Sequence, residues 1–148
     1  MVPQIVLVVV TLAARFAGWL GWDYVDSWPA SIAIGLAAMF VVTGIAHFAP
    51  PLRDDLIAIV PPRVPAPALL VSVTGVLELL GAVGLLILPA RLAAAICLFV
   101  LMLAMFPANI YAARMPEPPK SMTSRLSQRS VVEIVFLAAA AVVAAGSI

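Results

Sequence analysis

The stretch from Val73 to Leu88, VTGVLELLGAVGLLIL, has the apolar character of a membrane-crossing helix but carries one carboxylate, Glu78, near its middle. A charged side chain at the centre of a bilayer costs at least about 2.5 to 3.5 kcal/mol. A partner group, a bound proton or a water-filled cavity must therefore offset the cost of Glu78. The rest of the sequence narrows this choice.

Composition places the whole chain in the membrane. Of its 148 residues, 65% are hydrophobic and 10% are charged, and the mean hydropathy is +1.19. A soluble core of this size cannot hide so much apolar surface. We therefore expect an all-α integral membrane protein. Its formal net charge of +1 is not gathered into a basic or acidic block, which argues against nucleic-acid binding and directs the search for partners to membrane lipids and membrane-associated proteins.

Five apolar runs are long enough to cross a bilayer, since about 20 residues of helix span its core. The first run has no basic segment before it and is interrupted by Arg15, so we interpret it as a retained helix and not as a cleaved signal. We find no internal repeat and expect one transmembrane domain over residues 1–148. The predicted helices cover residues 3–20, 29–49, 67–88, 91–114 and 130–148.

The segment LRDDLIAIV, residues 52–60, lies between prolines and changes abruptly from charged to apolar residues. This pattern predicts a short helix in the membrane interface that covers the cytoplasmic mouth of the bundle. Arg53, Asp54 and Asp55 are expected to stay in water, while the apolar half turns toward the membrane.

Lys and Arg are unevenly divided between the two sides of the predicted bundle. One side has Arg91 alone, and its other loop carries Asp23 and Asp26 without a basic residue. The positive-inside rule then predicts an inner (plasma) membrane protein with a cytoplasmic N-terminus and an external C-terminus. The six basic residues of the cytoplasmic side are Arg53, Arg63, Arg114, Lys120, Arg125 and Arg129.

Counting 1.5 Å per residue from the cytoplasmic side puts Arg15 and Glu78 at nearly the same depth. We therefore expect a structural Arg15–Glu78 ion pair, which would fix the register of two helices. The alternative is a carboxylate that binds a ligand head group or relays protons. Thr74, Gly75, Gly81 and Ala82 fall on the face of Glu78; this stripe of small residues favours either close helix packing or a narrow cavity.

A second polar layer is expected near the cytoplasmic side, where His47, Thr43, Asn109 and Glu133 share a depth. Histidine titrates near neutral pH and suits proton exchange at a ligand head group. Alternatively, His47 is satisfied by a backbone carbonyl, and Asn109 binds carbonyls that Pro107 frees. If the layer forms a pocket with Glu78 as its floor, the apolar tail of a ligand would lie against Phe40, Met102, Met105 and Phe106.

Other chemistry finds little support. A single histidine without nearby acidic or sulfur ligands is poor evidence for a metal, and we expect none. The lone cysteine, Cys97, cannot cycle an internal disulfide and is expected to be a buried apolar residue. No phosphate-binding glycine loop, haem-attachment motif or nucleophile triad is present, so the sequence leaves open whether the protein is an enzyme.

Several motifs occur together in the order found in a known family. They are GIAHFAPP at residues 44–51, GVLELLGAVGLL at residues 75–86, RLAAA at residues 91–95 and FPAN at residues 106–109. Over residues 29–113 the chain resembles the DoxX family of small bacterial membrane proteins, and TSRLSQRSVVEIVFLAA is similar to that family's last helix. The resemblance implies a four-helix core, here with an additional N-terminal helix.

The resemblance also implies a place in redox-linked membrane complexes, without choosing among three functions. The first is a non-catalytic subunit or scaffold of a quinone, sulfur or antioxidant complex, with soluble or membrane oxidoreductase subunits as partners. The second is a binding protein or enzyme whose intramembrane pocket takes a quinone, an isoprenoid or another lipid. The third is an assembly chaperone for other membrane helices. The oligomeric state is open, a homo-oligomer included.

Overall fold

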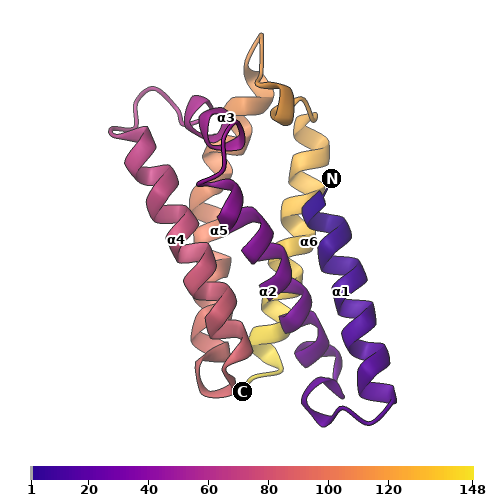
Figure 1. The fold of residues 1–148 in the computed structure, drawn as a ribbon. Coiled ribbons are helices and arrows are strands. Elements are labelled where there is room, and N and C mark those ends of the chain that lie inside the picture. The colour runs from indigo at the N-terminus through magenta and orange to yellow at the C-terminus, as the bar shows by residue number, and fades with distance from the viewer. Residues whose placement is uncertain (1) are drawn as a thin grey trace.

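The computed structural model describes residues 2–148, and within them every regular element is helical. Five long helices alternate in direction and form one bundle, with a short helix across one end (Figure 1). All five are long and apolar enough to cross a membrane, as expected of a multi-pass membrane protein. The elements are α1 (Val2–Trp19), η1 (Asp23–Val25), α2 (Trp28–Ala46), α3 (Leu52–Ala58), α4 (Pro67–Leu86), η2 (Leu88–Ala90), α5 (Arg91–Arg114), η3 (Lys120–Met122) and α6 (Leu126–Ala145).

The structure has a long helix in each of the five predicted ranges, with the largest difference at the start of the last one. Two helices begin at signals visible in the sequence: Ser27 caps α2 by accepting a hydrogen bond from the Ala30 amide at 3.2 Å, and Pro67 opens α4. Helix α6, however, begins at Leu126 and not at residue 130. The charged residue Arg129 was assigned to the loop, whereas it lies buried inside the first turns of this helix.

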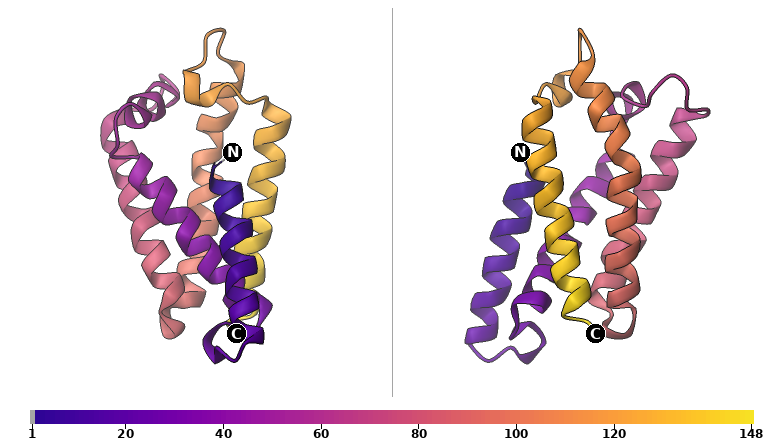
Figure 2. Two further views of the ribbon diagram at one scale, coloured as in Figure 1. Left: turned by 45° about the vertical axis from the view of Figure 1, so that its right-hand side comes forward. Right: turned by 180° about the vertical axis from the view of Figure 1, so that it is seen from behind.

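Helix α2 is the centre of the arrangement. It packs against α1 on one side and α4 on the other, and its first half also contacts α6; α5 packs between α4 and α6 (Figures 1 and 2). The apolar core lies where these helices meet. Its largest fully buried apolar side chains are Leu36, Met39, Leu85, Leu98 and Val143.

Two glycines allow neighbouring helices to approach closely. A Cβ atom on Gly35 of α2 would lie 2.0 Å from Thr11 Oγ1 and 2.8 Å from the Leu7 carbonyl oxygen of α1. A Cβ atom on Gly75 of α4 would lie 2.5 Å from His47 Cβ. The sequence predicted that small residues beside Glu78 permit close packing, and Gly75 confirms this.

The short helix α3 confirms the helix predicted in the 52–60 segment and lies across the end of the bundle where α2 ends and α4 begins (Figure 1). The prediction for Arg53 was wrong. Instead of pointing into water, its guanidinium donates hydrogen bonds to the His47 carbonyl at 2.8 Å and to Ser72 Oγ at 3.1 Å. The end of α2 leaves carbonyl groups without helical partners, and Arg53 supplies the donor for one of them.

Candidate functional site

The carboxylate of Glu78 is buried between α4 and α2, with 2% of the residue exposed. Thr43 Oγ1 donates a hydrogen bond to Glu78 Oε2 at 2.6 Å, and His47 Nδ1 lies 3.8 Å from the same oxygen. Thr43 and His47 are one turn apart on α2 and its C-cap, so they face α4 together. The hydrogen bond from Thr43 and the nearby ring of His47 therefore offset part of the cost of burying Glu78.

The hydrogen bonds of His47 fix which ring nitrogen carries a proton. Its Nδ1 lies 2.8 Å from the Thr43 carbonyl oxygen, and a carbonyl can only accept, so Nδ1 is protonated. In the neutral ring Nε2 is then without a proton. Burial lowers the pKa of His47 from its ordinary value of 6.5; the bond to Thr43 opposes this shift, and the charge of Arg53 adds to it.

The predicted Arg15–Glu78 ion pair is wrong. Arg15 binds Asp26 at 2.9 Å and lies over the rings of Trp19 and Trp28, beside the loop that joins α1 to α2. Because α2 packs against both α1 and α4, it separates the helix of Arg15 from that of Glu78. Glu78 also lies beside Thr43, near the end of α2, whereas Arg15 lies near the start of that helix, so the two do not share a depth.

The predicted second polar layer is divided into two groups. Thr43 and His47 belong with Glu78, as described above, whereas Asn109 Oδ1 accepts a hydrogen bond from Arg129 at 3.0 Å. Arg129 also donates to the carbonyls of Met122 at 2.5 Å and Ser124 at 3.2 Å. Within residues 2–148, no hydrogen bond or ion pair joins the two groups. Asn109 thus binds Arg129 of α6 and does not serve the carbonyls near Pro107.

The remaining candidate residues do not complete a pocket around Glu78. Thr74 donates to the carbonyls of its own helix, at Leu70 and Val71. Glu133 lies inside α6, one turn after Arg129, with its Oε1 buried and without a hydrogen-bond partner. Phe40 and Met102, proposed for a ligand tail, are part of the packed apolar core.

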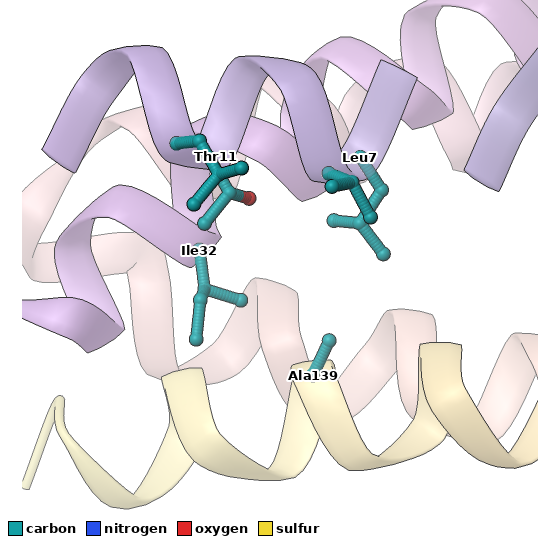
Figure 3. A pocket seen from close by; sticks show the side chains of 6 residues that line it. Leu7, Thr11, Ile32 and Ala139 are labelled. Carbon is teal, nitrogen blue, oxygen red and sulfur yellow. The ribbon is translucent and has the colours of Figure 1, made fainter. Parts of the chain in front are cut away.

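Two shallow apolar grooves are found on the outside of the bundle. One, with a volume of about 240 Å³, runs between α1 and α6 over α2 (Figure 3). The other, of about 200 Å³, lies on the outer face of α4. The first is lined by Leu7, Val8, Thr11, Leu12, Ile32 and Ala139, and the second by Ser72, Val73, Val76 and Leu77. Neither is lined by a residue of the Thr43–Glu78–His47 group.

Sequence reasoning missed the polar contacts at the other end of the bundle. Arg91 is buried, donates to the Leu85 carbonyl at 2.9 Å and to the Tyr24 hydroxyl at 2.7 Å, and lies over the Tyr24 ring. Tyr24 in turn donates to the Leu86 carbonyl. The sequence predicted Arg91 only as the lone basic residue of its side and as the start of the RLAAA motif. Tyr24, in the other loop at the same end of the bundle, was the available hint of a partner.

The prediction for Cys97 was also wrong. Its side chain is exposed on α5, on the surface that an apolar bundle turns toward lipid. The residues around it explain why: Ala94, Ala95 and Leu98 occupy the buried face of α5, and Cys97 falls beside them on the outer face.

These features define a class: a multi-pass helical membrane protein in which some buried polar side chains are bonded across helices, as Thr43 is to Glu78 and Asn109 is to Arg129. Residues 36–144 match the family model described as Domain of unknown function (DUF8561), and the chain belongs to that family. The match begins inside α2 and ends in the last turn of α6. No curated protein and no solved structure matches the chain.

Replacing Thr43 with valine is expected to lower the free energy of unfolding by about 1 to 2 kcal/mol, because the buried Glu78 loses its hydrogen-bond donor while the side-chain volume is kept. Unfolding in detergent measures the loss. The matched control is Thr74→Val, since the Thr74 hydroxyl binds only carbonyls of its own helix. Equal losses in the two variants would contradict a special role for the Thr43–Glu78 bond.

Proposed function

We propose that this protein is a non-catalytic subunit or scaffold of a redox-linked complex in the inner (plasma) membrane. One observation carries the proposal: three of the four ionisable residues buried in the described part of the chain, Glu78, Arg91 and Arg129, are each hydrogen-bonded to another helix or loop. Their polar atoms are therefore used to hold the bundle together. The outward faces of the long helices stay apolar and are suited to lipid or to other membrane helices.

The redox setting rests on the DoxX-like motifs, two of which contain residues of the Thr43–Glu78–His47 group or its close contacts. GIAHF contributes His47, and GVLELLG contributes both Gly75 and Glu78. If the motifs reflect common ancestry, the close packing that they produce here supports a shared four-helix core to which α1 is added. Quinone, sulfur or antioxidant chemistry would then belong to a partner subunit.

The proposed orientation places the α3 end in the cytoplasm. Arg63, Arg114, Lys120 and Arg125 lie in or beside the loops at this end. At the other end, Arg15 and Arg91 are bound to Asp26 and Tyr24. The folded protein therefore has more basic residues at the α3 end than at the other end, which supports the positive-inside prediction.

Purification of the tagged chain from its native membrane, in lipid nanodiscs, tests the proposal. Mass spectrometry of the intact particle is expected to find a redox protein bound in fixed ratio, and no stoichiometric quinone or isoprenoid on the chain. A bound lipophile that Glu78→Gln removes from a folded protein would instead support the pocket function. Changing sets of membrane proteins, without a fixed partner, would support the chaperone function, and a complex of identical chains would contradict the hetero-subunit proposal.

A further inference from the structure

Helix α3 is held to the bundle mainly by polar contacts. No residue of the helix itself is buried, and only Ile59, directly after it, lies in a buried position. On one side Arg53 binds the His47 carbonyl at 2.8 Å and reaches Ser72 and Ala68 at the start of α4. On the other side Asp55 accepts a hydrogen bond from Ser121 at 2.5 Å. A helix without a fully buried residue opens more readily than the core.

His47 links this polar attachment to the buried carboxylate. Its backbone carbonyl receives Arg53, while its ring donates to Thr43 and lies 3.8 Å from Glu78. The ring is nearly enclosed, with 7% of the side chain exposed. A proton added to this ring would bring a positive charge close to Arg53 and give Glu78 a charged partner.

Few other charges face the ring. Helix α2 has no ionisable side chain between Trp28 and Ala46. On α1, which packs against α2, Arg15 pairs with Asp26 at the far end. On α6, Arg129 is bound to Asn109, and Glu133 forms no hydrogen bond or ion pair with His47 within the described residues. On α5, which packs on α4, Arg91 is bound to Tyr24 at the far end. Glu78 and Arg53 are therefore the charges that act on His47 most directly.

We propose that His47 is a pH-sensitive latch for α3: its neutral ring permits the Arg53 contact, and protonation of the ring repels Arg53, turns the ring charge toward Glu78 and loosens the helix. The latch depends on the contacts of His47 and not on the proposed scaffold function. It would let acidification on the α3 side uncover the ends of α2 and α4.

The direction of the pH dependence follows from the pKa of His47. Burial lowers this pKa below its ordinary value of 6.5, so the closed form binds the proton more weakly than an opened form does. The closed form is therefore fully stable when the pH is above 6.5, the ordinary pKa of histidine. It loses stability as the pH falls through the lowered pKa of His47.

Hydrogen exchange of the full chain in nanodiscs tests the latch. Protection of residues 52–60, corrected for intrinsic exchange, is expected to fall severalfold between about pH 8 and about pH 5. Because the chain has a single histidine, imidazole NMR reports the titration of His47 without ambiguity. The two midpoints should coincide, while protection of the loop at residues 23–27, at the other end of the bundle, stays constant.

Two variants separate the latch from general acid effects. H47Q keeps Asp54 and Asp55 but cannot titrate at residue 47, so its α3 protection should not change over this interval. E78Q removes the carboxylate that favours the charged ring, so both midpoints should move to lower pH. The same pH dependence in H47Q as in the parent would overturn the proposal. If H47Q does not fold, an unchanged midpoint in E78Q, or titration of His47 without any loosening of α3, would overturn it.

Discussion

A Gly75→Leu variant is expected to lose roughly 3 kcal/mol of stability, because the new side chain has no space between α4 and the end of α2. Even a Cβ atom at this position would lie 2.5 Å from His47 Cβ and 2.8 Å from the Phe48 ring. The two helices must move apart, and the Thr43–Glu78 hydrogen bond between them is expected to break. Unfolding in detergent measures the loss of stability, and imidazole NMR measures the changed surroundings of His47.

The matched control for this variant is the next residue along α4. Val76 faces outward, with 47% of the residue exposed, so Val76→Leu adds apolar volume without displacing a helix. Its stability should stay near that of the parent. A Gly75→Leu protein as stable as Val76→Leu would show that α2 and α4 do not pack as closely as described.

A Gly35→Ala variant should release α1 from the bundle at a cost of roughly 2 to 3 kcal/mol. The added methyl group would lie 2.0 Å from Thr11 Oγ1 and 2.8 Å from the Leu7 carbonyl oxygen. Since α1 packs chiefly on α2, this one crossing controls its attachment. Limited proteolysis of the loop between α1 and α2, together with detergent unfolding, would detect the release.

The double variant Gly35→Ala, Thr11→Ala identifies the clash as the cause. Removing the Thr11 hydroxyl takes away the nearest obstacle but leaves the Leu7 carbonyl, so part of the stability should return. If the two substitutions have simply additive effects, the loss in Gly35→Ala does not come from contact with Thr11.

The five spans were predictable because they depend on local properties. Length and apolarity identify a membrane-crossing helix without knowledge of its neighbours, and prolines mark the start of α2 and α4. The one large error, at α6, came from treating charge as a sign of loop structure. Arg129 is tolerated inside the helix because Asn109 and the loop carbonyls supply its acceptors, and these contacts are not local.

The candidate site was predicted in part. Glu78, Thr43 and His47 were all identified from residue type and position, and the structure brings them together. The partner chosen for Glu78, Arg15, was wrong for two reasons. Counting residues misplaced the depth of Arg15, which lies at the loop before α2, and a depth does not show which helices touch. Helix adjacency depends on packing at residues such as Gly35 and Gly75, whose role is visible only once two helices are placed together.

A membrane protein is synthesised from its N-terminus onward, so a buried charge can meet partners that were made before it. When Glu78 is made, its partners Thr43 and His47 already exist. Arg91 likewise follows both of its partners, Tyr24 and Leu85, along the chain. A newly synthesised charge can therefore be neutralised or bonded by the part of the protein that has already entered the membrane.

The same order holds for the last helix. Arg129 is made after all three of its partners, which are Asn109, Met122 and Ser124. Arg15 and Asp55 are bonded to later residues: Asp26 follows Arg15 in the adjoining loop, 11 positions on, and Ser121 follows Asp55 by 66 positions. For Glu78, Arg91 and Arg129, vectorial synthesis thus makes the bonding partners before the charged residue itself.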